Sequence, residues 1–495
     1  MNIQYGSVRS NPASGGAAAA IVGMTLAAIL FGLVAVSAHP IVIGLAVGLL
    51  VGVALLSKPT WIIWLIYTLG LIVAGLLPLF FDAVTSKAVW GVSILGFFLM
   101  MIAIFRAVTE PSVTRGTPGF VWAALAFMVY ALLNSLIQWH TPYETLSGFK
   151  RYFQAYGLLF AFAWLSISET DVRRWRWLLL VVALVQLPWA IYERIVLMPI
   201  REGLKQLYPY MVPYDVVAGT FGASMHEGGG SAEMATFLII VFAFLLSRWR
   251  EKLVGMGKVA LATPFLLAPL FLGETKIVVV LLPLMFVVLF RREILSRPHV
   301  AAIALVAAAA MTFMAGYAYM AINKITFAEQ LDQTISYNFT NRGYGAQVLN
   351  RTTVLTFWAG RQGFQDPTTL VIGNGLGSAH DKMGGHVSQR YYGYGIGLTT
   401  ASTLLWEQGL FGSTLFALIV LLAWFAVRRL LRTARTPWVH ADAAAIEASL
   451  PLFAIYVFYR LTLLELLGFQ IVFCSLLGYL AWLVRYEIKI SKQTT

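Results

Sequence analysis

Long apolar segments alternate with short polar ones along the whole chain. Most of the apolar segments have about 20 residues, the length that an α-helix needs to cross the hydrocarbon core of a bilayer. Backbone amides inside a bilayer must pair within their own segment, so these runs predict helices. The pattern predicts about fourteen spans, roughly at residues 17–38, 40–57, 60–81, 88–105, 118–138, 152–168, 177–198, 230–247, 259–273, 276–290, 299–320, 398–427, 446–464 and 468–484.

One pair of predicted spans is ambiguous. The polar segment Gly273–Lys276 separates two apolar runs that are short for membrane helices, so they form either two spans or one broken, re-entrant hairpin. The predicted fold class is therefore an all-α polytopic membrane protein with about 12–14 transmembrane helices. One connection, residues 321–397, is much longer than the others and is expected to be a large, partly helical loop.

Arginine and lysine gather on every second connection between the apolar segments. An excess of cations is typical of the cytoplasmic connections of inner-membrane proteins. The pattern therefore predicts a multi-pass protein of the bacterial inner membrane, with both termini cytoplasmic and the 321–397 loop periplasmic. The cation clusters are Arg173, Arg174 and Arg176; Arg248, Arg250, Lys252 and Lys258; Arg291, Arg292 and Arg297; and Arg428, Arg429, Arg432 and Arg435.

Composition excludes several other classes of protein. Of the 495 residues, 59% are hydrophobic and only 12% are charged, which is not the composition of a soluble domain. The net charge of +13 follows the predicted topology and does not indicate a nucleic-acid-binding domain. The chain has one cysteine, Cys474, within an apolar run, so neither a disulfide framework nor a cysteine metal site is expected.

The chain divides into three predicted parts. Residues 1–320 form an N-terminal transmembrane bundle with a smaller periplasmic loop at 199–229, residues 321–397 form the large periplasmic loop, and residues 398–495 form the C-terminal transmembrane helices. The large loop contains too many aromatic residues for a solvated tether, so it is expected to fold.

Two features organise the second half of the large loop. Residues 349–364 have the spacing of an amphipathic helix, which Asp366-Pro367 is expected to end. The glycine-rich segment Gly373–Gly377 predicts a tight turn whose backbone amides could face an anion.

The loop also carries the residues best suited to chemistry. His380 and His386 flank its glycines, and a neutral imidazole can take a proton from a hydroxyl. Arginine side chains in the same loop can bind phosphate oxygens through two parallel hydrogen bonds. Because long ordered loops usually carry function, the loop as a whole is predicted to hold a site. For any single histidine or arginine the alternative, an ordinary surface or packing residue, stays open.

Charged residues at membrane depth form another candidate set. Such charges are costly, so they pair with each other or line a polar cavity. Arg460 and Glu465 are five residues apart, a poor helical match, so each is expected to find a partner elsewhere. An interhelical ion pair and a substrate role are both compatible with this set. No metal-ligand spacing, dinucleotide fingerprint or nucleophile elbow is present in the sequence. The set is Lys150, Arg151, Glu274, Lys276, Arg460 and Glu465.

The order of these features resembles that of the O-antigen ligases and the Wzy-type O-antigen and exopolysaccharide polymerases. The resemblance covers about residues 145–430. Its closest part runs from Arg351 through the glycine-rich segment to the start of the next span. The matching stretches are Gly219–Gly222 with Ala232–Met234, Gly273–Lys276, Arg351 with Trp358 and Pro367, Gly373–Gly377, and Leu405–Gly412.

The resemblance implies metal-independent glycosyl transfer on the periplasmic face, without a cofactor. The implied donor is a glycan linked to undecaprenyl pyrophosphate, and the implied partners are membrane lipids, a flippase and a chain-length regulator of the same pathway. His386 is the first candidate base and His380 the second. The residues expected to contact pyrophosphate or glycan are Arg351, Arg361, Arg390, Arg201, Lys150 and Arg151.

One departure from the family favours polymerase over ligase. Ligases usually carry a histidine shortly before a Glu-x-Gly motif, whereas this chain has Ile396–Thr400 there, without a histidine. Polymerase is therefore the expected activity, and an O-antigen ligase that moves glycan to lipid A core is the first alternative. A polysaccharide or lipid transporter is the second alternative, although no internal repeat is visible. A structural assembly scaffold is the third.

Overall fold

The computed structural model describes residues 58–80, 90–208, 211–226, 228–296, 347–362, 366–381 and 384–493, with a few single positions between 299 and 335. The contacts below lie within the unit that residues 64–495 form. All regular structure in the described residues is helical. The α-helices are α3 (Pro59–Thr68), α4 (Ala74–Phe80), α6 (Trp90–Thr109), α7 (Gly119–Ile137), α8 (Pro142–Phe153), α9 (Tyr156–Trp164), α10 (Glu169–Tyr192), α11 (Met198–Gly203), α12 (Ser231–Arg250), α13 (Met256–Leu272), α14 (Val278–Leu289), α15 (Arg291–Ser296), α18 (Thr353–Arg361), α19 (Pro367–Ile372), α20 (His386–Arg390), α21 (Thr400–Thr433), α22 (Pro437–Tyr459), α23 (Thr462–Glu465) and α24 (Leu467–Gln493).

Eight helices of the described residues are long and apolar enough to cross a membrane. The described part of the chain is therefore that of a multi-pass α-helical membrane protein. The two runs around Gly273 form shorter apolar helices, α13 and α14. The predicted spans at 17–38 and 40–57 lie outside the described residues, and so does nearly all of 299–320. The eight helices are Pro59–Leu77, Trp90–Thr109, Gly119–Ile137, Glu169–Gln206, Ser231–Arg250, Thr400–Thr433, Pro437–Tyr459 and Leu467–Ser491.

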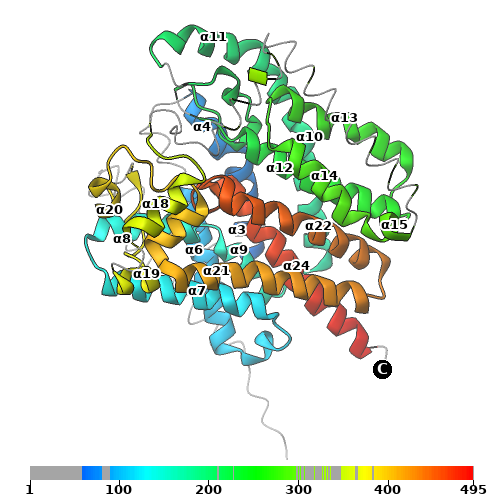
Figure 1. Cartoon of the computed structure of the whole chain (residues 1–495). Coiled ribbons are helices and arrows are strands. Elements are labelled where there is room, and N and C mark those ends of the chain that lie inside the picture. Colours follow the sequence, from blue (N-terminus) through cyan, green and yellow to red (C-terminus); the bar gives the residue numbers. More distant parts are fainter. Residues whose placement is uncertain are drawn as a thin grey trace, which may run out of the picture. The chain divides into compact units, whose positions relative to one another are not determined.

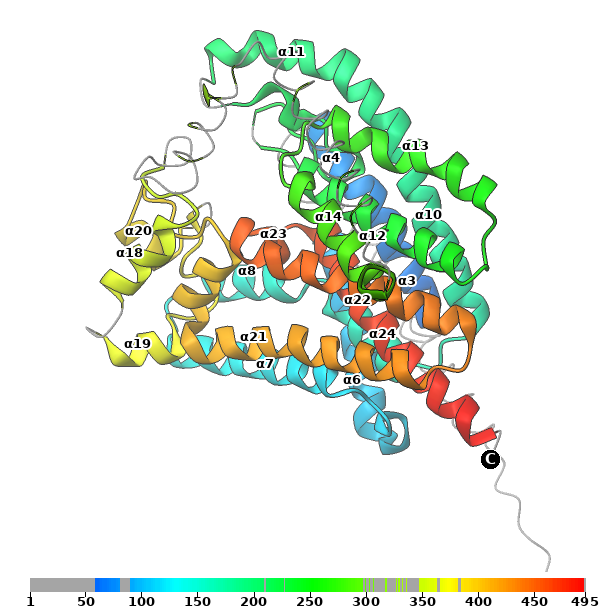
Figure 2. The same ribbon diagram turned by 45° about the vertical axis from the view of Figure 1, so that its right-hand side comes forward.

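The long helices pack in pairs that are distant in sequence. Helix α7 runs along α21, α12 packs against α22, and α9 lies between α6 and α24 (Figure 1). The helices of the large loop, α18 to α20, lie beside α8 at one end of the α7–α21 pair in both views (Figure 2). The large loop is thus held against α8 rather than standing apart from the bundle.

The predicted span at 152–168 is wrong in its length. The chain breaks at Gln154–Ala155, and the apolar run continues as α9, a helix of 9 residues that are all buried. The break brings α9 backbone to backbone with α6, because a Cβ on Gly157 would lie 2.0 Å from the carbonyl oxygen of Gly96. Close approach through small residues is a common means of helix packing in membranes.

The predicted helix at 349–364 is shorter than its spacing suggested. Helix α18 begins only at Thr353, because the Asn350 side chain accepts hydrogen bonds from the amides of Thr352 (3.0 Å) and Thr353 (2.8 Å) and so turns the chain. Asp366 does not simply end a helix. Its side chain accepts a hydrogen bond from the amide of Thr369 and caps the start of α19.

Candidate functional site

Residues 460–466 connect α22 to α24, and several segments that lie outside the long helices contact this connection. It contains the short helix α23. The carbonyl oxygen of Arg460 accepts hydrogen bonds from the amide (3.2 Å) and the hydroxyl (2.7 Å) of Thr400, at the start of α21. The first turn of α21 therefore fixes where this connection begins.

Glu465 is contacted by two basic side chains that come from distant parts of the sequence. Its Oε1 lies 2.8 Å from Nη1 of Arg151, near the end of α8, and 3.2 Å from Nε2 of His380, in the large loop. Lys150 lies close enough to interact electrostatically with both Arg151 and Glu465. We call Lys150, Arg151, His380 and Glu465 the Glu465 cluster.

Helix α8 supports one side of this cluster. It begins where the Thr141 side chain accepts a hydrogen bond from the amide of Glu144, a favourable N-terminal cap. Glu144, Gly148 and Arg151 have helical spacing and share one face. Gly148 allows the large loop to approach that face, since a Cβ there would lie 2.5 Å from the amide nitrogen of Gly377.

The break between α8 and α9 also supports the cluster. The Gln154 amide group donates to the carbonyl oxygen of Glu465 (3.1 Å), and its oxygen accepts from the hydroxyl of Ser93 in α6 (2.9 Å). Gln154 is itself buried. The departure from a continuous membrane helix thus places a buried amide where it holds the 460–466 connection.

Burial alters the protonation of the two basic residues of α8. The pKa of Lys150 falls from 10.5 to about 8, mainly because burial disfavours the ammonium and secondly because Arg151 repels it, while Glu465 acts in the opposite direction. Burial also lowers the pKa of the Arg151 guanidinium, against the attraction of Glu465. The Lys150 amine lies 4.9 Å from the ring centre of Trp90, a cation–π contact. Two adjacent, partly desolvated cations would be stabilised by an anion.

Little space is enclosed within the cluster. The cavity that Arg151, His380 and Glu465 help to line measures about 10 Å³, which is roughly the volume of one water site. The side chain of Glu465 is 39% exposed, whereas that of Arg151 is 13% exposed. An anion would therefore reach Arg151 from the side of Glu465, by taking the place of that carboxylate.

The glycine-rich turn Gly373–Gly377 has the tight backbone that its sequence predicts, with φ angles of +82°, +87° and +85° at its glycines. The amide of Asn374 donates to the carbonyl oxygen of Trp406 (3.0 Å), and that of Gly375 donates to the carbonyl oxygen of Glu407 (2.9 Å). The amides of its last glycine and of Ala379 bind the Glu407 carboxylate, at 3.1 Å for Ala379. These amides are thus used within the protein, contrary to the expectation that they face a substrate anion.

Replacing Gly377 with alanine should loosen the large loop from α8. A Cβ at this position would lie 2.4 Å from the carbonyl oxygen of Glu144, in addition to the cost of roughly 1–2 kcal/mol for an L-residue at positive φ. Gly393→Ala is a matched control, because the φ of Gly393 is +79° and a Cβ added there would meet nothing within 4 Å. Limited proteolysis and thermal unfolding should show a clearly larger effect for G377A, and equal effects would contradict the contact.

Arg351 contacts the end of α22, next to the 460–466 connection. Its Nε donates to the carbonyl oxygen of Tyr459 (2.9 Å), and its guanidinium lies 4.4 Å from the centre of the Tyr459 ring. Arg351 was predicted to bind pyrophosphate, and the structure places it beside the connection on the side of the large loop.

Arg460 and Glu465 find separate partners, as their spacing predicted. Nη1 of Arg460 lies 3.4 Å from Oε2 of Glu233, in the first turn of α12, and 3.1 Å from the carbonyl oxygen of Gly229. The 460–466 connection therefore joins the glycine-rich segment before α12 to the Glu465 cluster.

Arg201 lies in the same polar region as Arg460, since Asp215 interacts with both. It is fully buried in α11, and its Nη1 donates to the carbonyl oxygen of Ser224. Asp215 interacts electrostatically with both Arg460 and Arg201, and burial still raises its pKa above the ordinary value although both arginines lower it. Arg201 is thus a buried member of this polar region, and not a member of the Glu465 cluster.

Two predicted pyrophosphate ligands are exposed. Arg361 ends α18 with its guanidinium 5.5 Å from the centre of the Phe357 ring, and Arg390 ends α20. The structure does not bring Arg361 and Arg390 into the Glu465 cluster.

The two predicted bases lie at different places along α8. Nδ1 of His386 is 2.8 Å from Oε1 of Glu144, and the ring of His386 lies 4.7 Å from that of His140, measured between centroids. Glu144 and Arg151 are two helical turns apart, about 10 Å along the axis. The structure thus places His380, and not His386, beside the partly buried Arg151.

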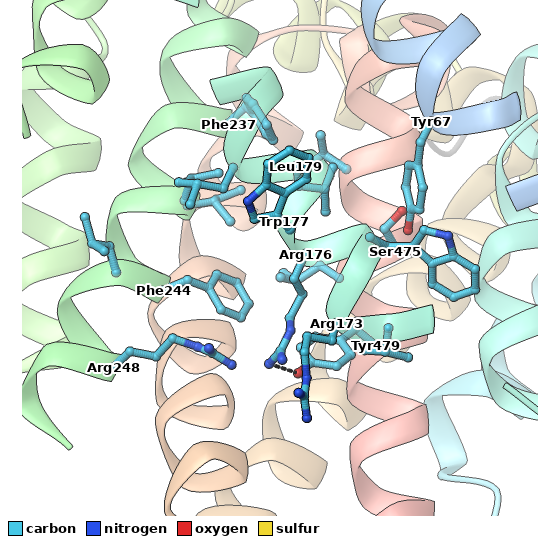
Figure 3. Close-up of a pocket in the computed structure, with 18 of the residues that line it drawn as sticks. Tyr67, Arg173, Arg176, Trp177, Leu179, Phe237, Phe244, Arg248, Ser475 and Tyr479 are labelled. Carbon is cyan, nitrogen blue, oxygen red and sulfur yellow. Dashed lines mark hydrogen bonds between the residues drawn. The ribbon is translucent and has the colours of Figure 1, made fainter. Parts of the chain in front are cut away.

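A larger cavity, of about 330 Å³, is lined mainly by apolar side chains of α10, α12 and α24. Arg173, Arg176 and Arg248 lie toward one end of it, and Phe237 lies at the other (Figure 3). Arg176 and Arg248 both bind the buried Asp442 carboxylate, at 2.5 and 2.7 Å. The lining suits a hydrocarbon chain, and two of the three arginines are engaged in holding helices together.

Sequence reasoning missed the role of three residues around these groups. It was not foreseen that the Glu407 carboxylate accepts hydrogen bonds from the amides of Gly377 and Ala379. His140 and Glu144 were not singled out. His140 precedes Thr141, the N-terminal cap of α8, so the two residues do not share a helical face and their spacing carried no signal.

No protein-family model matches the chain, and no curated protein matches it significantly.

Proposed function

We propose that the protein is an inner-membrane polysaccharide polymerase, which joins oligosaccharide units carried on undecaprenyl pyrophosphate at the periplasmic face. The observation that supports this proposal best is the gathering of basic side chains from separate segments around residues 459–466. A pyrophosphate carries charge that such side chains can neutralise. The proposed set is Lys150, Arg151, Arg351, His380 and Arg460.

The proposed reaction needs a stabilised leaving group and a proton acceptor. The acceptor hydroxyl oxygen forms a bond to the anomeric carbon, and the bond from that carbon to the pyrophosphate oxygen breaks. The bonding electrons leave with the lipid pyrophosphate, where Arg151 and Lys150 stabilise the added charge. The hydroxyl proton passes to His380, whose imidazole contacts the same carboxylate oxygen of Glu465 as Arg151 does. This chemistry requires no metal ion.

Glu465 has two tasks in this proposal. Before the donor binds, its carboxylate pairs with Arg151, so the partly buried guanidinium is not left without a counter-ion. When pyrophosphate takes that place, Glu465 keeps its contact with His380 (3.2 Å). A carboxylate beside an imidazole favours the imidazolium that forms on proton uptake.

The larger cavity suits the lipid part of the donor. Phe237, at one end of it, lies one helical turn along α12 from Glu233, the partner of Arg460. A prenyl chain in the cavity would therefore have its head group on the side of the 460–466 connection. The volume of about 330 Å³ accommodates a part of such a chain.

Reconstitution tests the proposal directly. The purified protein in liposomes, given only the lipid-linked repeat unit, should produce a ladder of longer lipid-linked glycans. Transfer that occurs only after lipid A core is added would identify a ligase instead. Movement of labelled donor across the bilayer without new glycosidic bonds would identify a transporter and contradict the proposal.

Donor binding should weaken as the pH rises through about 8. The pKa of Lys150 is about 8, so its ammonium is present below that pH and is lost above it. Between about pH 7 and about pH 9 the KM for donor should rise, because a neutral amine does not attract phosphate. The stability of the folded protein should change in the opposite direction. The free-energy cost of burying the Lys150 ammonium is full below about pH 8 and falls as the pH rises above it.

Lys150→Arg is the matched variant for this pH dependence. Arginine stays charged over the whole range, so the rise of KM between pH 7 and 9 should disappear. A pH profile that is the same in the wild type and in K150R would exclude Lys150 as its source.

A further inference from the structure

Three potential metal ligands meet where the large loop touches the start of α8. His140 lies in the connection between α7 and α8, Glu144 in the first turn of α8, and His386 at the first position of α20. One ligand atom of each lies within 4.8 Å of those of the other two. The cluster is distinct from the Glu465 cluster, from which it is separated by about two turns of α8.

The carboxylate of the cluster is already fixed in place. Glu144 is buried, and its Oε1 lies 2.8 Å from Nδ1 of His386. Its Oε2 accepts a longer hydrogen bond, 3.4 Å, from the main-chain amide of His386. The His140 ring lies 4.7 Å from the His386 ring, at an interplanar angle of 36°. Two of the ligands are therefore positioned by the fold, and His140 is exposed and can adjust.

We propose that His140, Glu144 and His386 bind a zinc ion. Two imidazole nitrogens and one carboxylate oxygen are a donor set that zinc prefers, whereas magnesium and calcium prefer oxygen ligands alone. Tetrahedral zinc, with bonds of about 2.0–2.1 Å, needs ligand atoms roughly 3.3 Å apart. Small rotations of His140 and His386 from the present separations would satisfy this geometry, and water would fill the fourth position.

The ion would fasten the large loop to α8. Its ligands come from both sides of that contact: His140 and Glu144 from the α8 side, and His386 from the loop. Fixing α20 also limits the motion of the glycine-rich turn Gly373–Gly377. This turn packs against Gly148, and His380 follows it in the chain. The zinc ion therefore has a positioning role, and it need not touch the reacting groups.

Metal binding can be measured without any assay of activity. The full-length protein, purified in detergent and stripped with a chelator, should bind one zinc ion per chain in equilibrium dialysis. Cobalt in place of zinc should give the visible absorption of a tetrahedral site. His140→Ala and His386→Ala should each weaken zinc binding at least about 100-fold, since even partners of metal ligands contribute about 10–100-fold.

His440→Ala is the matched control. His440 also pairs with a carboxylate, that of Glu251 at 3.0 Å, but the described residues place no third ligand beside this pair. Its zinc binding should equal that of the wild type. Melting temperatures measured in chelator control for the folding of each variant. Because His140 is exposed, His140→Ala tests the site even if His386→Ala folds poorly.

Protease sensitivity gives a second readout. Zinc should protect residues 347–399 of the wild type and fail to protect the His140→Ala variant. Absence of stoichiometric zinc binding, or binding that neither histidine variant weakens, would overturn the proposal. Neither result depends on whether the protein is a polymerase, so the two proposals fail separately.

Discussion

Arg151→Lys should lower the rate of glycan transfer by roughly 10²–10³, the size of effect expected when one preorganised donor to a developing charge is lost. Lysine keeps the charge but offers a single ammonium in place of a planar fork. Arg151 is 13% exposed and is held against Glu465, so a shorter-reaching or differently shaped cation has little freedom to compensate. The measurement is the initial rate of polymer formation in liposomes that contain saturating lipid-linked donor.

Arg390→Lys is the control for this experiment. Arg390 is exposed at the end of α20, so the same change of side chain should leave the rate close to that of the wild type. Both variants should be compared at equal amounts of folded protein, because Arg151 also pairs with a partly buried carboxylate. A near-normal rate for R151K at wild-type stability would exclude a phosphate clamp at this position.

The positions of many helices could be predicted from the sequence because the bilayer imposes both their length and their apolar surface. Spans expected at 118–138 and 230–247 are found at Gly119–Ile137 and Ser231–Arg250. The same reasoning failed at 152–168, where an equally apolar run is buried in protein and not exposed to lipid. Composition does not distinguish these two surroundings, since both exclude water.

The charged residues show a similar limit. Because a charged side chain is costly in an apolar medium, Arg460 and Glu465 were each expected to have a partner of opposite charge, and both have one. Which partner each finds depends on the packing of the whole bundle. Arg151 and Glu465 are separated by 314 positions, and no local spacing relates them.

The glycine-rich turn illustrates why a motif predicts backbone shape better than it predicts a ligand. The glycine-rich segment predicted a tight turn, and Gly373, Gly375 and Gly377 do turn the chain with positive φ angles. The anion that their amides were expected to meet is Glu407, a side chain of the same chain. Exposed amides need an acceptor, and the sequence does not say whether the protein or a substrate supplies it.

His380→Ala should lower the rate of transfer by roughly 10²–10⁴, the usual contribution of a general base, while donor binding is largely kept. His386→Ala should lower the rate at saturating donor much less than His380→Ala, because His386 lies beside Glu144 and His140, about two helical turns from Arg151, and affects the Glu465 cluster only through the position of the large loop. The sequence alone ranked His386 first, whereas the proposed mechanism assigns the proton to His380 because of its contact with Glu465.

The two variants and their double variant separate three mechanisms when kcat and donor KM are measured for each. Loss of kcat in H386A, with normal kcat in H380A and in H140A, would restore His386 as the base and place the reaction at the start of α8. Loss in H380A alone supports proton transfer within the Glu465 cluster. Full-length polymer from the double variant would eliminate histidine catalysis at these positions. The cations would then carry the reaction, since departure of a neutralised pyrophosphate can precede deprotonation of the acceptor hydroxyl.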